Sequence, residues 1–173
     1  MALALAAGCG KPENPTISSI SLPEDAPDLS LRGVAFARLS EGRVVSRGTA
    51  EQLDYRRSGG RLEATYGAAT IYPQPGTNLA SLGVTRFIAT RLEGEVPAKR
   101  GTASAGVRLD AVRGDTARTE RVHLDGDVLH TDKRVVARGP GYQVDGNGLF
   151  ARTDGSVIQF TGGVTGQLAA GQR

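Results

Sequence analysis

The feature that most constrains the fold of this chain is an alternation of apolar and polar residues with a period of two. Residues 61–66 (RLEATY), 121–128 (RVHLDGDV) and 158–168 (IQFTGGVTGQL) each place apolar or small residues on one face and polar residues on the other. Successive side chains of a β-strand point to opposite sides, so this pattern predicts strands with one buried face. Residues 49–55 (TAEQLDY) begin like a helix cap, but their alternation favours a strand. The chain is therefore predicted to be all-β.

Glycine-rich turn signals separate these strands. Ser58-Gly59-Gly60, Asp154-Gly155 and the segment 145–148 (DGNG) each lie between two strand-like runs, as expected of hairpins. The segment 145–148 also resembles part of a calcium loop, but it lacks the regular acidic ligands and the closing glutamate. A hairpin turn is the preferred interpretation there. Residues 158–168 are expected to form one unbroken strand.

Composition excludes several classes of protein. The single cysteine rules out an internal disulfide and a cysteine-based zinc site, and no apolar run reaches the roughly 18 residues of a membrane helix. The chain contains no tryptophan, so its core is expected to consist of Leu, Val and Ala. The net charge is only +3, and acidic residues are interleaved with the basic ones, which indicates a mixed soluble surface and no nucleic-acid partner.

The N-terminal region is expected to carry a membrane anchor. Residues 1–9 end in Ala-Ala-Gly-Cys, which resembles a bacterial lipobox, with Cys9 as the lipidated residue. Residues 10–30 contain four prolines and predict a flexible tether. The folded domain is expected to span 31–168, followed by a short tail at 169–173. Two acyl chains on Cys9 would hold such a protein firmly on a membrane.

Candidate catalytic chemistry is sparse. The clearest cluster of possible metal ligands is His123, Asp125, Asp127 and His130, with Asp132 nearby. Neighbouring positions on one strand face are about 6.6–7 Å apart, which is wide for one ion, so an exposed strand face is preferred. The sequence contains no nucleophile elbow, P-loop or dinucleotide fingerprint. No catalytic residue, metal or cofactor is predicted, and a metal-dependent hydrolase is the weakest hypothesis.

A short pattern recurs along the chain: a large apolar residue, any residue, Gly, any residue, then Val. It occurs at 92–96, 124–128 and 160–164. Together with 134–136, 146–149 and 160–168, and with 42–72 (GRVVSRGTAEQLDYRRSGGRLEATYGAATIY), it resembles the periplasmic proteins of lipopolysaccharide export, most closely the LptC kind of the OstA-like group. The resemblance covers about residues 31–168. Members of that family usually have a transmembrane anchor, which Cys9 would replace here.

The resemblance implies an antiparallel β-jellyroll, or open two-sheet trough, that performs no chemistry. Such a protein holds lipid acyl chains in a hydrophobic trough and passes them along a periplasmic bridge. It implies a periplasmic location with an anchor in a membrane, the inner membrane being preferred over the outer one. The implied partners are lipopolysaccharide, an inner-membrane transporter complex and a neighbouring OstA-like protein, which would pair with the edge strand expected at 156–168.

The apolar alternating positions are the candidate trough lining: Leu62, Leu92, Val96, Val122, Leu124, Val128, Ile158, Phe160 and Val164. A second group, Arg134, Arg138 and Arg152, could meet lipid phosphates, although a solvated face is the preferred interpretation. The alternative function is a surface or periplasmic β-sandwich, an adhesion or structural module whose sheets pack together without binding lipid.

Overall fold

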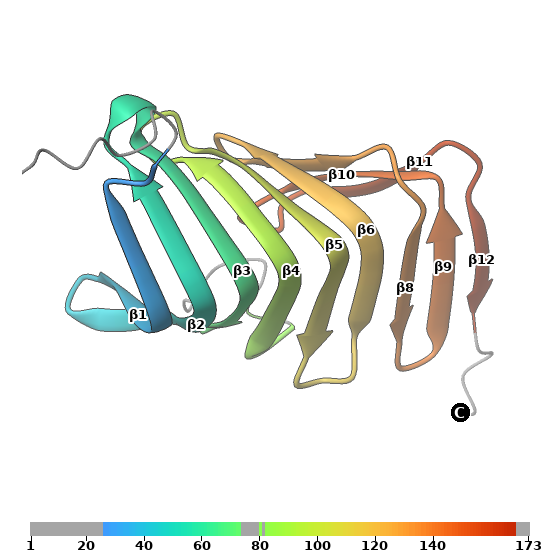
Figure 1. Ribbon diagram of the computed structural model, residues 1–173. Coiled ribbons are helices and arrows are strands. Elements are labelled where there is room, and N and C mark those ends of the chain that lie inside the picture. Colours follow the sequence, from blue (N-terminus) through green and yellow to red (C-terminus); the bar gives the residue numbers. More distant parts are fainter. Residues whose placement is uncertain (1–25, 74–79, 81, 169–173) are drawn as a thin grey trace, which may run out of the picture.

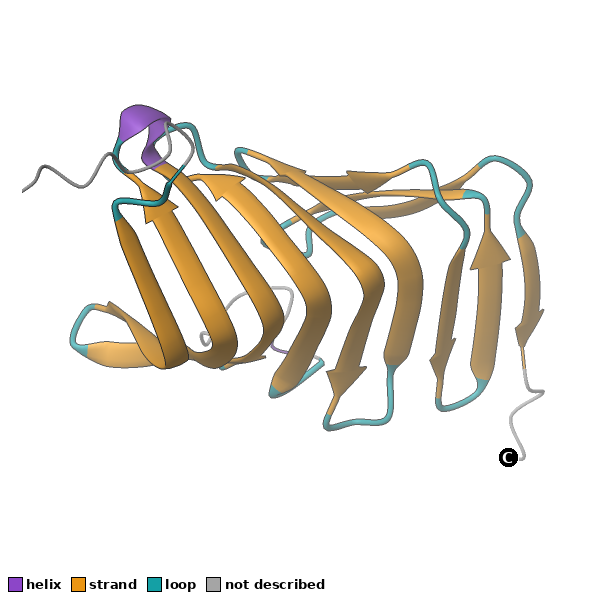
Figure 2. Ribbon diagram, viewed as in Figure 1, coloured by secondary structure: helices purple, strands orange, loops and turns teal. Residues whose placement is uncertain are grey.

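The computed structural model describes residues 26–73, 80 and 82–168, and all structural statements refer to these residues. They form one open sheet of twelve antiparallel strands, and a short 3-10 turn, η1 (Ser58–Gly60), lies between the second and third of them (Figure 2). The strands are β1 (Leu29–Ser40), β2 (Arg43–Arg56), β3 (Arg61–Ile71), β4 (Thr85–Glu95), β5 (Arg100–Ala111), β6 (Thr116–Asp125), β7 (Val128–Thr131), β8 (Val135–Gly139), β9 (Tyr142–Gly146), β10 (Gly148–Arg152), β11 (Ile158–Thr161) and β12 (Thr165–Leu168). The predicted open, all-β antiparallel architecture is confirmed.

The sheet begins as a meander and then divides. Each of β1 to β6 pairs with the next strand along the chain. The first part of β6 pairs with β8, and its last part pairs with β7. Two branches continue from there, β7-β10-β11 and β8-β9-β12. In Figure 1, β10 and β11 run nearly crosswise to β9 and β12, so the two branches lie at an angle to each other.

A line of bends crosses the sheet and separates these branches. Gly33 in β1, Tyr66 in β3 and Ala105-Gly106 in β5 all have positive φ. At Ala105-Gly106 the register of β5 is interrupted with both of its neighbours, β4 and β6. The bends lie beside one another in the register. Gly33 falls between the pairs that join 32 to 52 and 34 to 50, and Tyr66 falls between the pairs that join 65 to 91 and 67 to 89. Positive φ is costly for residues other than glycine, so Tyr66 and Ala105 are strained positions. The bends fold one sheet into two halves.

These halves are named here after the strand that each contains. The β7 half comprises β7, β10, β11 and residues 29–32, 52–56, 61–65, 91–95, 100–104 and 121–125 of the longer strands. The β8 half comprises β8, β9, β12 and residues 34–40, 43–50, 67–71, 85–89, 107–111 and 116–119. The two expected sheets are therefore parts of a single folded sheet.

The core lies in the angle between the halves. Ala89 and Val107 from the β8 half pack with Ala103 from the β7 half, and Ala89 is 0% exposed. Leu92 of the β7 half covers Gly67 of the β8 half so closely that a Cβ at Gly67 would collide with it. The remaining buried apolar residues lie on this same face of the sheet: Ala50, Ala64, Ala111, Val135, Ala137 and Ala151. Small side chains thus bring the halves together along the bend.

Two predicted elements were wrong. Residues 158–168 are not one strand: Gly162 and Gly163, with φ of 69° and 82°, separate β11 from β12. The segment 145–148 is not a hairpin, because β9 and β10 do not pair and only Asn147 lies between them. Both segments carry the chain from one half to the other. The alternation continues through a bend, so it could not reveal these breaks.

Other predictions of local structure are confirmed. Turns at Ser58–Gly60 and at Asp154-Gly155 join neighbouring strands, and residues 49–55 lie within β2. β1 begins at Leu29, so the end of the predicted tether belongs to the sheet. Cys9, the predicted lipobox, most of the tether and the tail at 169–173 lie outside the described residues. In the described part of the chain, no helix is long and apolar enough to span a membrane.

Candidate functional site

The candidate site is the apolar inner face between the two halves. Six of the nine predicted lining residues lie on it. Leu92 pairs with the buried Ala64 and Ala103, and this register places its neighbours on the same face. The six residues are Leu62, Leu92, Val122, Leu124, Ile158 and Phe160, and all belong to the β7 half. The alternation therefore identified one wall of the interior.

The other three predicted residues do not line the interior. Val96 lies in the turn after β4 and is 62% exposed, and Val164 lies half-exposed between β11 and β12. Val128 pairs with Asp125 and so shares its outer face. The reason is the two-residue turn at 126–127, which reverses the chain and interrupts the count of alternating positions. Leu129, opposite Leu124, takes the inner position that Val128 was expected to hold.

The opposite wall was missed by the sequence analysis. In the β8 half, Phe87 packs against the core cluster, and cross-strand pairing places Ala69, Gly48 and Phe36 beside it on the same face. Alternation in residues 85–89 (TRFIA) was the available signal for Phe87. Further inner-face residues of this half are Val34, Leu109, Val135 and Val144.

The interior remains open at the outermost strands of the sheet. At one end, Leu29, Leu31 and Phe36 of β1 are exposed, Phe36 by 45%. At the other end, Ile158 of β11 is 58% exposed and Leu168 of β12 is 84% exposed. All five lie on the inner face by their cross-strand pairing. Large apolar side chains left in water are unfavourable by roughly 25 cal/mol per Å², so each end presents an unfavourable apolar surface to the solvent.

The same terminal strands have unpaired backbone edges. Among the described strands, β1 pairs only with β2, β11 only with β10, and β12 only with β9. The prediction of an edge at 156–168 is confirmed in this sense, although the edge consists of two strands. An unpaired edge offers backbone donors and acceptors to a further strand.

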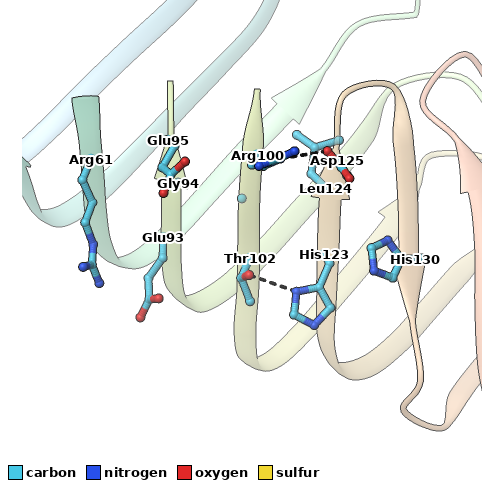
Figure 3. Close-up of a pocket in the computed structure, with 11 residues that line it drawn as sticks. Arg61, Glu93, Gly94, Glu95, Arg100, Thr102, His123, Leu124, Asp125 and His130 are labelled. Atoms are coloured by element: carbon cyan, nitrogen blue, oxygen red, sulfur yellow. Dashed lines mark hydrogen bonds and ion pairs between the residues drawn. The ribbon is translucent and has the colours of Figure 1, made fainter. Parts of the chain in front are cut away.

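The outer face of the β7 half is polar. A hollow of about 400 Å³ there is bordered by Arg61, Glu95, Arg100 and Asp125, which follow one another in the register of β3 to β6 (Figure 3). The Nε of Arg100 lies 3.1 Å from an oxygen of Asp125. Exposed ion pairs of this kind contribute little stability, about 0–1 kcal/mol each. They keep this face soluble.

Three of the candidate metal ligands, His123, Asp125 and His130, line this hollow, whereas Asp127 lies in the turn between β6 and β7 and Asp132 follows β7. His123 and His130 are opposite each other on β6 and β7, with ring centroids 5.3 Å apart, and Nδ1 of His123 is 3.0 Å from Oγ1 of Thr102 (Figure 3). Asp125 is paired with Arg100, and Asp132 lies 3.8 Å from Lys133. In the described ranges, no group of three potential ligands could hold a metal ion. A metal-dependent hydrolase stays a hypothesis that no such group of described residues supports.

The three arginines singled out from the sequence do not converge. Arg134 forms a two-pronged ion pair with Asp145, with Nε 2.9 Å from Oδ1, and this hydrogen bond lowers the pKa of Asp145. Arg152 lies 3.9 Å from Asp154 in the β7 half, whereas Arg138 is in β8. Hydrogen bonds from the hydroxyl and amide of Ser156 lower the pKa of Asp154. The ion pairs of Arg134 and Arg152 are local and lie at the surface, which agrees with the solvated face preferred from the sequence.

No family model matches the chain, and no curated protein matches it. The resemblance to the lipopolysaccharide-export proteins therefore rests on the short motifs quoted above, and the folded open sheet is the feature of the structure that bears on it.

Proposed function

We propose that this protein is a non-enzymatic component of lipopolysaccharide export that holds lipid acyl chains between the two halves of its folded sheet. The observation that carries the proposal is the open inner face, where Leu, Ile and Phe side chains remain exposed at both ends of the sheet. A packed sandwich would bury these side chains, because burying one of them contributes about 1.5–3 kcal/mol. An acyl chain lying along the inner face would cover them.

The proposed mechanism needs no reacting group. An acyl chain enters at one open end, lies against the aliphatic wall formed by Leu62, Leu92 and Leu124, and leaves at the other end. Leu92 and Phe160 both contact a glycine of the opposite half, Gly67 and Gly146 respectively. These two side chains would move aside as the halves separate. Transfer is then driven by the difference in apolar contact between donor, carrier and acceptor.

The proposed partners follow from the edges. A neighbouring OstA-like bridge protein would pair with β1 or with β11 and β12, and its own apolar face would continue the interior. The proposal places the protein in the periplasm, attached to the inner membrane through Cys9 and supplied by an inner-membrane transporter complex.

The first experiment measures binding of a fluorescent fatty acid and of lipopolysaccharide to the purified protein. We expect saturable binding that Phe160→Asp abolishes and Phe160→Ala weakens about tenfold, because both changes remove a large apolar group from the interior. Phe150→Asp and Phe150→Ala are matched controls. Phe150 lies on the next strand, β10, but on the outer face, opposite His130. The control variants should bind as the unchanged protein does.

Circular dichroism of each variant distinguishes loss of binding from loss of folding. If Phe160→Asp does not fold, the comparison of Phe160→Ala with Phe150→Ala still tests the proposal. A folded Phe160→Ala protein with undiminished binding would contradict the proposal. So would an unchanged protein that binds neither ligand, which is the behaviour expected of an adhesion or structural module.

A further inference from the structure

A second hollow lies on the outer face of the β8 half and has no role in the proposed lipid interior. Its volume is about 600 Å³. Two arginines border it, Arg47 on β2 and Arg86 on β4, and both directly oppose Thr70 on the strand between them, β3. The residues at the base of the hollow have small side chains: Ala35, Ala37, Thr49 and Ala68. Phe87, the neighbour of Arg86, points into the core, so Arg86 points outward.

The two arginines are available for a ligand. Elsewhere on the outer surface Arg61, Arg100 and Arg108 each have a carboxylate partner among the described residues. Neither Arg47 nor Arg86 forms an ion pair or hydrogen bond with a described residue. The nearest acidic position in the register is Asp110, opposite Arg86 on β5, and its carboxylate lies 2.7 Å from Arg108.

The spacing suits one compact anion. Neighbouring strands are about 4.7–4.9 Å apart, so the backbones of β2 and β4 are separated by roughly 10 Å. Two arginine side chains can lean toward each other over the single strand between them. Thr70, which lies between the two arginines in the register, carries a hydroxyl that can donate a third hydrogen bond. Because the residues at the base of the hollow are small, they leave room for a group of tetrahedral shape.

We propose that Arg47, Thr70 and Arg86 form a binding site for a phosphate group. Guanidinium groups offer paired N–H donors that match phosphate oxygens, and such charge-assisted hydrogen bonds are stronger than neutral ones. The site would accept a phosphomonoester from a lipid headgroup or from a soluble phosphate compound. The proposal does not rest on the lipid-carrier function, since the hollow and the apolar interior lie on opposite faces of the sheet.

The test measures binding of inorganic pyrophosphate by calorimetry, and of phosphatidylcholine vesicles with and without phosphatidic acid by co-sedimentation. Arg47→Gln and Arg86→Gln should each weaken binding about tenfold, because each removes a charge-assisted contact. Thr70→Val keeps the charge and the shape and should weaken binding about threefold. Arg118→Gln is the matched control. It removes the same charge from the same outer face, on β6, outside the hollow.

Each outcome decides the proposal. Pyrophosphate binding that the two arginine variants weaken more than Thr70→Val does supports a site for soluble phosphate. Binding only to vesicles that contain phosphatidic acid supports a headgroup site. Absence of binding in both assays overturns the proposal. Equal losses in Arg118→Gln and Arg86→Gln also overturn it, because they show diffuse attraction of a basic surface. Phe160→Asp, if folded, should retain phosphate binding, so failure of the lipid proposal and failure of this one are distinguishable.

Discussion

At the residue scale, side chains pack closely over glycine, both across the bend between the two halves and within one half. Leu92 lies over Gly67 across the bend, and Phe36 lies over Gly48 on the neighbouring strand. A larger residue at either position would meet a side chain already in place. Protein interiors are packed like organic crystals, so there is little free space to absorb an added methyl group. Gly67 and Leu92 therefore form a pair in which the size of one limits the other.

Gly67→Ala should destabilise the protein by about 1–3 kcal/mol, because the new methyl group displaces Leu92. Chemical denaturation measures the change in the free energy of unfolding. Gly166→Ala is the control, since a Cβ there would lie 3.6 Å from the carbonyl oxygen of Gln143, an ordinary contact distance. Adding Leu92→Val to Gly67→Ala should recover part of the loss. Equal effects of the two alanine variants would show that the contact across the bend is unimportant.

Tyr142 provides a pH-dependent contact. Its hydroxyl donates to Asp115, with 2.8 Å between the oxygens, and burial followed by this bond raises the pKa of Tyr142 to about 12. Because the pKa of Tyr142 is higher in the folded state, its protonated hydroxyl stabilises the fold fully at pH values below the pKa of an unfolded tyrosine, near 10. This stabilisation is lost as pH rises toward 12. Melting temperatures of the unchanged protein should therefore fall between pH 10 and 12. The fall should be smaller in Tyr142→Phe, and equal slopes in both proteins would refute the assignment.

At the element scale, the strand breaks decide which half each segment joins. β11 and β12 follow each other in sequence, yet they end different branches of the sheet. Gly162 and Gly163 make this possible, because two successive left-handed residues redirect the chain at little cost only when both are glycine. Asn147 stands at the corresponding break between β9 and β10, and a Cβ at Gly162 would lie 3.2 Å from it.

Replacing both Gly162 and Gly163 by Ala should cost roughly 1–2 kcal/mol per residue, because alanine disfavours positive φ. The loss should be local. Hydrogen exchange of amides in β11 and β12 should accelerate, while amides in β3 to β5 keep their protection. Uniform acceleration throughout the sheet would contradict a local crossing and would indicate that the break organises the entire fold.

At the scale of the whole molecule, the sheet has two open ends with exposed backbone edges and exposed apolar side chains. β1 forms one end, and β11 with β12 forms the other. Both ends bend at corresponding places, at Gly33 in β1 and at Gly162-Gly163 between β11 and β12. A strand added at either end would thus continue both halves of the sheet. This geometry supports the edge pairing that the proposed function requires.

If these edges pair between molecules, sedimentation velocity should show association that increases with protein concentration. Ile158→Lys combined with Leu168→Lys should shift the protein toward monomer, because each lysine places a charge on the apolar inner face that a paired copy would cover. Gln167→Lys places a charge on the outer face of the same edge strand and is the control for charge alone. A protein that stays monomeric at all concentrations would count against pairing between identical copies.

The sequence by itself determined the class of fold and one wall of the interior. Apolar residues at every second position predict strands wherever they occur, and Leu62, Leu92 and Leu124 lie on the predicted face because no turn interrupts their strands. Val128 was misplaced because the turn at 126–127 reverses the chain. Assigning residues to one face by taking every second position is valid only within one uninterrupted strand.

Only the tertiary structure decided how the sheet folds and which residues meet. The period of two is the same on both sides of a bend, so it cannot show that residues 158–161 and 165–168 belong to different halves. The same limit applies to Arg47 and Arg86, which are distant in sequence and flank one threonine because of the register of three strands. Register depends on turns and on packing between strands, and these interactions exist only once the chain has folded.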